Sequence, residues 1–198
     1  MFVYEKKLQY PIRIKNTNPK LAAAIISQYG GPDGELGASL RYLSQRYSMP
    51  YPELKGLLTD IGTEELGHLE MVVTIVHQLT RNLTEQQIKD AGFEAYFVDH
   101  TTGVFPQFAS GYPWSAATMQ VTGDTIADLT EDLAAEQKAR VTYDNILRLS
   151  DDPDVTDAIR FLRAREIVHF QRFGEGLRLV KDRLGEKNVY YMNPSFDQ

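Results

Sequence analysis

Hydrophobic residues recur every three to four positions in three long stretches of the chain, the spacing of one face of an α-helix. The stretches are residues 52–79, 124–149 and 153–184, and each predicts a long helix. The apolar faces contain a few polar members: Glu65 and His68, then Asp132, Glu136, Arg140 and Tyr143, then Glu166 and His169. Because an unpaired charge in an apolar core is costly, these polar residues are the first candidates for a function.

A fourth helical stretch covers residues 19–47, with Asn18 as N-cap and Pro19 at the first helical position. Its middle, residues 30–34, reads Gly-Gly-Pro-Asp-Gly. In a helix interior glycine is unfavourable by about 1 kcal/mol and proline by about 3 kcal/mol. We expect a kinked helix here, in which small residues let backbones pack closely beside Glu35. A loop between two helices is the alternative.

Shorter segments separate the helices. Residues 48–52 and 150–153 contain proline and predict tight turns. Thr84 and Gln87 have the spacing of a capping box, which predicts a short helix that ends near Gly92.

Residues 93–123 lack periodicity and form a connection that is long for a compact domain. Such a crossover is a feature of some four-helix bundles. Residues 1–18 predict an extended N-terminal arm that lies on the surface or on a neighbour, and residues 186–198 a C-terminal tail. We therefore expect an all-α four-helix bundle with one long crossover, forming a single domain over residues 1–198.

The chain contains two Glu-x-x-His motifs, and a lone glutamate precedes each of them at the same distance. Each set is a lone glutamate followed 30 residues later by Glu-x-x-His: Glu35, Glu65 and His68, and then Glu136, Glu166 and His169, displaced by 101 residues. A glutamate three residues before a histidine shares its helical face. With 13 Glu and 4 His in 198 residues, chance placement gives fewer than one such pair. Four helices presenting Glu, Glu-x-x-His, Glu and Glu-x-x-His inward predict a dinuclear, carboxylate-bridged metal site.

The donor types narrow the choice of metal. Two imidazoles with several carboxylates suit manganese, iron or zinc rather than magnesium or calcium. The chain has no cysteine, which excludes disulfides, thiolate-bound metals and cysteine-ligated iron–sulfur clusters. Two bridged metals favour two-electron chemistry with peroxide or dioxygen, since each metal changes by one electron. The spacing alone leaves three interpretations: a peroxide-disproportionating enzyme, a di-iron oxidase or ferroxidase, and an iron-storage subunit.

Other residues near the motifs are more ambiguous. Tyr42 shares a helical face with Glu35, so its phenol either hydrogen-bonds a carboxylate ligand or fills the core. Arg140 is either a charge partner of the site or a surface residue. The residues not expected at the site are Glu64 and Glu70, which should be solvated, and His77 and His100.

The composition excludes several kinds of partner. Hydrophobic content of 42% and charged content of 24% are typical of a soluble globular protein. A net charge of −6 argues against nucleic acid. The first 20 residues have no apolar core of a secretory signal, and no run approaches the ~18 apolar residues of a membrane span. We expect a cytoplasmic protein with no membrane partner.

Three runs resemble the manganese catalases. They are Gly-Thr-Glu-Glu-Leu-Gly-His-Leu-Glu-Met at residues 62–71, Gly-Gly-x-x-Gly-Glu at residues 30–35 and Lys-Leu-Gln-Tyr-Pro at residues 7–11. The resemblance spans most of the chain, and its compact length is most similar to the spore-coat branch, the coat protein JC type. It implies a ferritin-like fold, hydrogen peroxide as substrate, and two manganese ions per subunit, with iron as the alternative metal.

The resemblance also implies roles for the site residues. The implied ligands are Glu35 and His68 for one manganese ion, Glu136 and His169 for the other, and Glu65 as the bridge. Glu166 is similar to the family's non-ligating carboxylate, which shuttles protons, and Tyr42 to a tyrosine beside the ligands. The implied reaction is 2 H₂O₂ → O₂ + 2 H₂O.

Members of the family assemble as hexamers, and a coat-type member would also have other spore coat proteins as partners. Some members place a basic residue just before the third-helix glutamate or seven residues after it, where this chain has Ala135 and Tyr143. We therefore expect different electrostatics around the site and weaker turnover. The alternatives are a di-iron oxidase or ferroxidase on the same ligands, and a structural spore coat protein with a vestigial site.

Overall fold

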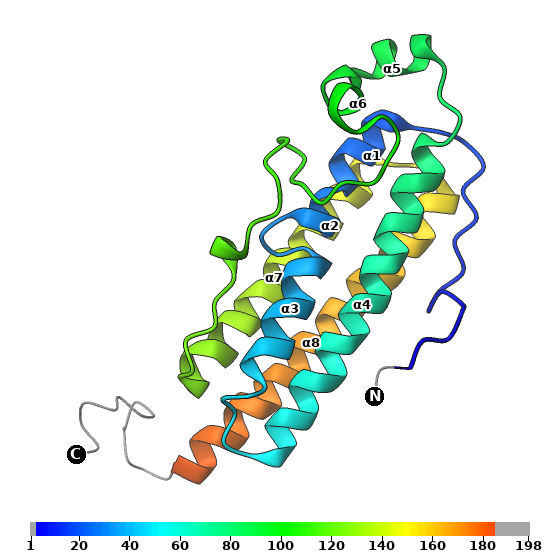
Figure 1. The fold of residues 1–198 in the computed structure, drawn as a ribbon. Coiled ribbons are helices and arrows are strands. Elements are labelled where there is room, and N and C mark those ends of the chain that lie inside the picture. The colour runs from blue at the N-terminus through cyan, green and yellow to red at the C-terminus, as the bar shows by residue number, and fades with distance from the viewer. Residues whose placement is uncertain (1–2, 185–198) are drawn as a thin grey trace.

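The structure, a computed structural model, describes residues 3–184 (Figure 1). Its α-helices are α1 Pro19–Ile25, α2 Ser27–Gly30, α3 Glu35–Gln45, α4 Pro52–Thr80, α5 Glu85–Ala91, α6 Glu94–His100, α7 Thr125–Leu149 and α8 Pro153–Leu184, and one 3₁₀ turn covers Ala116–Thr118. Residues 3–184 contain no strand, and their one isolated β-bridge joins Gln107 to Pro113. The predicted all-α class is confirmed.

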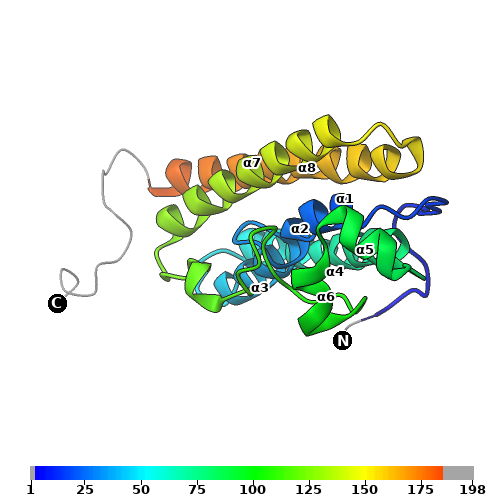
Figure 2. The ribbon, with the colours of Figure 1, turned by 90° about the horizontal axis from the view of Figure 1, so that it is seen from above.

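The long helices lie in two layers, which Figure 2 shows along the bundle. α7 packs against α8 in one layer. In the other layer α3 packs beside α4. α1 and α2 lie in line with α3 and also pack against α4 (Figure 1). Contacts between α4 and α8 and between α3 and α7 join the layers. This is the predicted four-helix bundle, with α1, α2 and α3 together forming its first leg.

That first leg is broken rather than kinked, so the continuous helix expected over residues 19–47 is wrong. α2 ends at Gly30, Gly31 is extended with φ −70° and ψ 168°, and a new helix begins at Glu35. A Cβ on Gly30 would lie 2.2 Å from the backbone of residues 106–107 in the crossover. The glycines therefore allow the close backbone approach expected beside Glu35, but across a break in the helix.

The other predicted helices begin and end close to the expected residues. α4, α7 and α8 match the stretches identified from periodicity. Thr84 and Gln87 form the predicted capping box of α5, and Gly92 ends that helix with φ 68°. At the start of α8, the Asp152 carboxylate accepts a hydrogen bond from a backbone N–H at 2.9 Å. The predicted tail, residues 186–198, lies outside the described residues.

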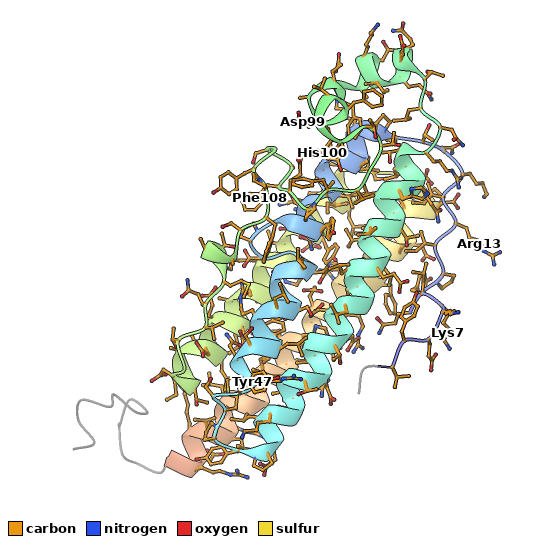
Figure 3. The ribbon with its side chains drawn as sticks, viewed as in Figure 1. Lys7, Arg13, Tyr47, Asp99, His100 and Phe108 are labelled. Carbon is orange, nitrogen blue, oxygen red and sulfur yellow. The ribbon has the colours of Figure 1, made fainter. Side chains whose placement is uncertain are left out.

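The crossover contains a helix that the sequence does not predict. The seven residues of α6 are too few for a recognisable hydrophobic period. His100 ends this helix, and its ring stacks on Phe105 with centroids 4.1 Å apart and meets the edge of Tyr96 at 5.0 Å. Figure 3 shows His100 in the crossover near one end of the molecule. His100 therefore has a packing role, as expected for a histidine away from the motifs.

The N-terminal arm lies on the chain's own bundle. Figure 3 shows it beside α4, with Lys7 and Arg13 along it. Ile12 and Ile14 are buried. Gln78 of α4 accepts from the Ile14 backbone N–H at 2.7 Å and donates to the Ile12 carbonyl at 3.1 Å. Hydrogen bonds between the Gln78 side chain and the arm backbone thus hold the arm against α4.

Two apolar clusters divide the core. One lies toward α1 and α5 and includes Met71 and Leu162, and the other lies toward the opposite end and includes Leu58 and Phe173. Along α4 and α8, the two Glu-x-x-His motifs fall between these clusters. None of the described helices contains a stretch long and apolar enough to cross a bilayer.

Candidate metal centre

Six side chains meet in the middle of the bundle, with each of its four legs contributing. They are Glu35 on α3, Glu65 and His68 on α4, Glu136 on α7, and Glu166 and His169 on α8, and none is more than 2% exposed. Four of them, Glu65, His68, Glu166 and His169, each offer a donor atom within 4.8 Å of the others. The residues that the motifs single out therefore form one buried cluster.

Glu65 lies between the two histidines. Its Oε2 is 2.7 Å from Nδ1 of His68, and its Oε1 is 2.7 Å from Nδ1 of His169. Glu35 lies on the first side, with Oε2 4.0 Å from Nδ1 of His68. Glu136 lies on the second side, with Oε2 3.5 Å from Nδ1 of His169. Each Nδ1 thus faces two carboxylates, one of which is shared.

Several atoms of this cluster are buried without a hydrogen bond. Among residues 3–184, no aligned hydrogen bond is formed by Oε1 of Glu65, Oε2 of Glu136, Oε1 of Glu166, Nε2 of His68 or Nδ1 of His169, although the first and last of these atoms lie 2.7 Å apart. An unsatisfied buried polar group costs about 1–3 kcal/mol. Converging carboxylate oxygens and imidazole nitrogens are the donors that manganese and iron accept. The cluster therefore fits a metal pair.

The outward nitrogens of both histidines face one carboxylate, that of Glu64. Its Oε1 is 3.5 Å from Nε2 of His68, and its Oε2 is 3.1 Å from Nε2 of His169. Arg165 donates to the two oxygens at 2.7 and 3.1 Å. Gln9 of the arm donates to Oε1 at 2.8 Å. A carboxylate at one ring nitrogen fixes the tautomer that leaves the other nitrogen open to a metal.

The expectation that Glu64 is solvated is therefore wrong. Its side chain is 16% exposed, and its hydrogen bonds face inward to the histidines as well as outward. The apolar stripe of α4 does not include Glu64, because this residue lies on the flank of that stripe. A usable signal was present nonetheless: Glu64 precedes His68 by one helical turn, and Arg165 follows it by the same 101 residues that separate the two motifs.

Two tyrosines hold the lone glutamates. Tyr42 donates to Oε1 of Glu136 at 2.5 Å, and Tyr143 donates to Glu35. Both tyrosines are fully buried. For Tyr42 this hydrogen bond to a carboxylate is one of its two expected roles. The role of Tyr143 is not predicted, although it follows Glu136 by seven residues just as Tyr42 follows Glu35.

Burial and neighbouring charges set the protonation of the metal-free cluster. Burial raises the pKa of Glu35 and Glu166 well above the usual range, and other carboxylates of the cluster add to the rise. Burial lowers the pKa of the two histidines, but the surrounding carboxylates, Glu65 above all, together outweigh it and raise the pKa of His68 to about 10 and that of His169 to about 12. Burial raises the pKa of Glu65, but the histidines reverse this and lower it. Metal binding would displace the protons that this cluster holds.

The remaining candidates lie outside the cluster. Arg140 pairs with Asp144 at 2.7 Å, so of its two interpretations the structure supports the surface residue. His77 is exposed and, as expected, is not part of the cluster. Glu70 is half-buried and accepts a hydrogen bond from Tyr4 of the arm at 2.5 Å.

Comparison with known proteins identifies relatives along almost the whole chain. The family model described as manganese containing catalase matches residues 1–192. The chain is 52% identical over 190 residues to Protein CotJC of Bacillus subtilis, covering 96% of this chain and 100% of that protein. It is 37% identical over 191 residues to a probable manganese catalase of Clostridium acetobutylicum, covering 95% of this chain and 84% of that one.

The fold matches a solved structure equally well. The crystal structure of wild-type KatB, a manganese catalase from Anabaena, superimposes with a TM-score of 0.86 at 32% sequence identity, covering 98% of this chain and 85% of that one. The bundle thus has the ferritin-like helical fold that the resemblance implies. The family model, the sequence relatives and the fold agree, and this chain belongs to the manganese catalase family.

Proposed function

We propose that this chain disproportionates hydrogen peroxide to dioxygen and water at a pair of manganese ions. One observation carries the proposal: the two oxygens of Glu65 lie 2.7 Å from Nδ1 of His68 and from Nδ1 of His169, so a single carboxylate is placed to join two metal sites. Membership of the manganese catalase family supports both the metal and the peroxide substrate.

The geometry supports a division of the ligands into two sets with one bridge. The proposed ligands are Glu35 and His68 for one ion, Glu136 and His169 for the other, and Glu65 between them. Nδ1 is the ligating atom of each histidine, because each Nε2 faces Glu64. The hydrogen bonds from Tyr42 and Tyr143 orient the two lone glutamates toward the centre.

Oxidising one peroxide to dioxygen releases two protons and two electrons, and reducing a second peroxide to two waters consumes them. Bound manganese supplies the electron exchange, each ion changing by one electron. Glu166 takes up and returns protons at its carboxylate. Burial and the neighbouring carboxylates raise its pKa well above the usual range, which favours the protonated form of this carboxyl in the metal-free protein. Its Oε1 is buried and has no hydrogen-bond partner within residues 3–184, so it is available to substrate.

Metal content and gas exchange test the function together. Protein purified from cells supplied with manganese should contain two manganese ions per chain and release dioxygen from hydrogen peroxide. Iron with consumption of dioxygen would instead indicate the di-iron oxidase or ferroxidase. Metal-free protein that assembles unchanged would indicate a structural coat protein with a vestigial site.

Two variants separate a ligand from the proton carrier. Glu65→Gln should lose the metal pair, because an amide cannot bridge two ions as a carboxylate does. Glu166→Gln should keep both ions and turn over more slowly; loss of an ion would make Glu166 a ligand. Glu175→Gln is the matched control, since Glu175 lies on the same helix and is exposed.

We also propose that residues 1–198 form one domain and that the chain assembles as a homo-hexamer. Membership of the manganese catalase family supports an oligomeric assembly. Light scattering should give about 135 kDa, six times the chain mass of 22.5 kDa. A particle of one chain mass would contradict the hexamer.

The likeness to Protein CotJC supports a place in the spore coat, with other coat proteins as partners. Fractionation of purified spores should recover the chain with the coat layers. Its recovery in the spore core alone would rule this location out.

A further inference from the structure

A second group of buried polar side chains lies beside the metal centre, between α3 and α7. Arg41 and Gln45 come from α3, and Asp128 and Asp132 come from α7. All four are 0% exposed. We call this group the polar strip. It lies outside both the metal cluster and the two apolar clusters of the core.

The donors and acceptors of the polar strip satisfy one another only in part. Within residues 3–184, hydrogen-bond partners are lacking for Nε and Nη1 of Arg41, Oε1 of Gln45 and both carboxylate oxygens of Asp132. The remaining Arg41 nitrogen, Nη2, donates to the Pro32 carbonyl at 3.1 Å and lies 4.0 Å from Asp33. A buried guanidinium and a buried carboxylate thus share one region without direct contact.

A small hydroxylic molecule would satisfy these groups. Buried charges without partners are strongly unfavourable, and native proteins satisfy such groups through internal water. Gln45 and Arg41 both lie near Asp132, since each opposes the rise in the pKa of Asp132 that burial causes. No ion pair within 4.0 Å joins Arg41 and Asp132 in the described part of the chain. A molecule that both donates and accepts hydrogen bonds can bridge them.

The polar strip reaches the metal centre at its inner end. Arg41 precedes Tyr42, whose hydroxyl donates to Glu136. Asp132 lies one helical turn before Glu136 on α7. Tyr42 and Asp132 are also near enough for Asp132 to add to the rise that burial causes in the Tyr42 pKa. The inner end therefore lies beside a proposed metal ligand.

At its outer end the polar strip reaches the last residues of the crossover. Nε2 of Gln45 donates to the Gln120 carbonyl at 2.9 Å. The Asp128 carboxylate accepts from the backbone N–H groups of Thr122 and Gly123 at 2.9 and 3.1 Å, and from the Thr122 hydroxyl at 2.7 Å. The polar strip is covered at the molecular surface by three exposed residues, Gln120, Thr122 and Gly123.

We propose that the polar strip is a binding site for small hydroxylic molecules, water and hydrogen peroxide, and that peroxide passes through it from the crossover to the metal pair. Both molecules donate and accept hydrogen bonds, so either can join Arg41 to Asp132. The passage of peroxide rests on the catalase function proposed above, whereas the binding of water does not. The proposal also gives the crossover a role, because its backbone closes the outer end.

The first experiment is a high-resolution crystal structure of the metal-free protein, before and after a soak in hydrogen peroxide. Ordered solvent or peroxide between Arg41 and Asp132 is expected. Direct contact of the guanidinium with the Asp132 carboxylate, with no molecule between them, would overturn the site. This experiment gives an answer whether or not the protein is a catalase.

The second experiment makes the polar strip apolar while preserving its volume. The double variant Arg41→Met with Asp132→Leu should keep two manganese ions per chain and lower kcat/KM by about tenfold or more. Relaxation of water protons by the bound manganese should fall as well, because solvent exchange through the strip is blocked. Unchanged kcat/KM and unchanged relaxation would overturn the passage.

Two further variants provide a control for this test and a replacement if the double variant does not fold. Arg148→Met with Asp151→Leu is the control, since both residues are exposed. If the double variant does not fold, Asp132→Asn keeps the shape and an acceptor, and should reduce kcat/KM less than tenfold without changing metal content. A normal kcat/KM in Asp132→Asn together with direct Arg41–Asp132 contact in the crystal would overturn the proposal.

Discussion

Tyr42 and Tyr143 cross the bundle in opposite directions, each to a glutamate on the other's helix. Tyr42 of α3 donates to Glu136 of α7, and Tyr143 of α7 donates to Glu35 of α3. The two tyrosines are separated by 101 residues, as are the two glutamates. The repeat seen in the motifs therefore extends to hydrogen bonds, and the two halves of the site support each other.

Removing either hydroxyl should weaken the metal centre on the opposite side. In Tyr42→Phe the Glu136 carboxylate loses a buried donor, and in Tyr143→Phe the Glu35 carboxylate does. Loss of such a partner typically lowers metal affinity about 10- to 100-fold and destabilises the fold by about 1–3 kcal/mol. Manganese titration and thermal unfolding measure the two effects.

The control for this pair is Tyr47→Phe, because Tyr47 is 76% exposed and lies just beyond α3. It should change neither metal affinity nor stability. Tyrosine variants that bind manganese like the unmodified protein would show that the two hydroxyls do not position the ligands.

A second prediction concerns Glu64, which faces the Nε2 atoms of both histidines. Replacing it by glutamine removes the negative charge that stabilises both rings in the ligating tautomer. We expect affinity at both metal positions to fall about 10- to 100-fold, rather than at one of them alone. Stepwise manganese titration followed by electron paramagnetic resonance distinguishes the two patterns.

Glu70→Gln is the matched control. Glu70 is on the same helix, but its carboxylate accepts a hydrogen bond from Tyr4 of the arm rather than facing the histidines. Gln9→Ala should have a smaller effect than Glu64→Gln, because Arg165 still holds the Glu64 carboxylate. Loss of one ion with the other unchanged in Glu64→Gln would contradict the shared role.

A third prediction is that the metal-free protein loses stability as pH rises from 5 to 9. The folded-state pKa values of His68 and His169 are about 10 and 12, above the ordinary histidine value of 6.5. Burial and neighbouring carboxylates raise the pKa of Glu35 and Glu166 too. The native state therefore binds more protons than the unfolded state in this range, and each extra proton lowers the unfolding free energy by about 1.4 kcal/mol per pH unit.

The depressed pKa values of Glu64 and Glu65 act in the opposite direction, but only below about pH 4.5, where these carboxyls become protonated in the unfolded chain. Denaturant melts of metal-free protein at several pH values measure the slope. Added manganese should raise the melting temperature more at pH 8 than at pH 6, because ions compete with the protons of the cluster. A manganese effect that shrinks as pH rises would contradict this assignment.

The sequence predicts those parts of the molecule in which local chemistry and tertiary structure agree. The Glu-x-x-His motifs and their apolar stripes identify α4 and α8, because burial on one helical face imposes a period on the chain. Proline and glycine at residues 30–34 show correctly that the first leg is irregular. They do not decide between a kink and a break, because the close approach of residues 106–107 to Gly30 is a tertiary contact.

The parts of the site that the sequence does not predict share one property. Glu64 lies on the flank of its helix, and Tyr143 and Arg41 resemble ordinary core or surface residues until their partners are known. Their roles depend on which side chain of another helix they reach, and no periodicity within one helix contains that information. Only the displacement of 101 residues links Glu64 to Arg165 and Tyr42 to Tyr143 in the sequence itself.

The last prediction tests the break in the first leg. A Cβ at Gly30 would lie 2.2 Å from the backbone of residues 106–107, which no side-chain rearrangement can relieve. Gly30→Ala should therefore displace the crossover from α2 and lower the unfolding free energy by about 2–4 kcal/mol. Gly56→Ala on α4 is the control, because nothing lies within 4 Å of its Cβ position, and alanine there should add about 0.5–1 kcal/mol. Gly30→Ala should also speed hydrogen exchange at residues 104–108. If the variant is as stable as the unmodified chain and exchange there is no faster, the crossover does not depend on this contact.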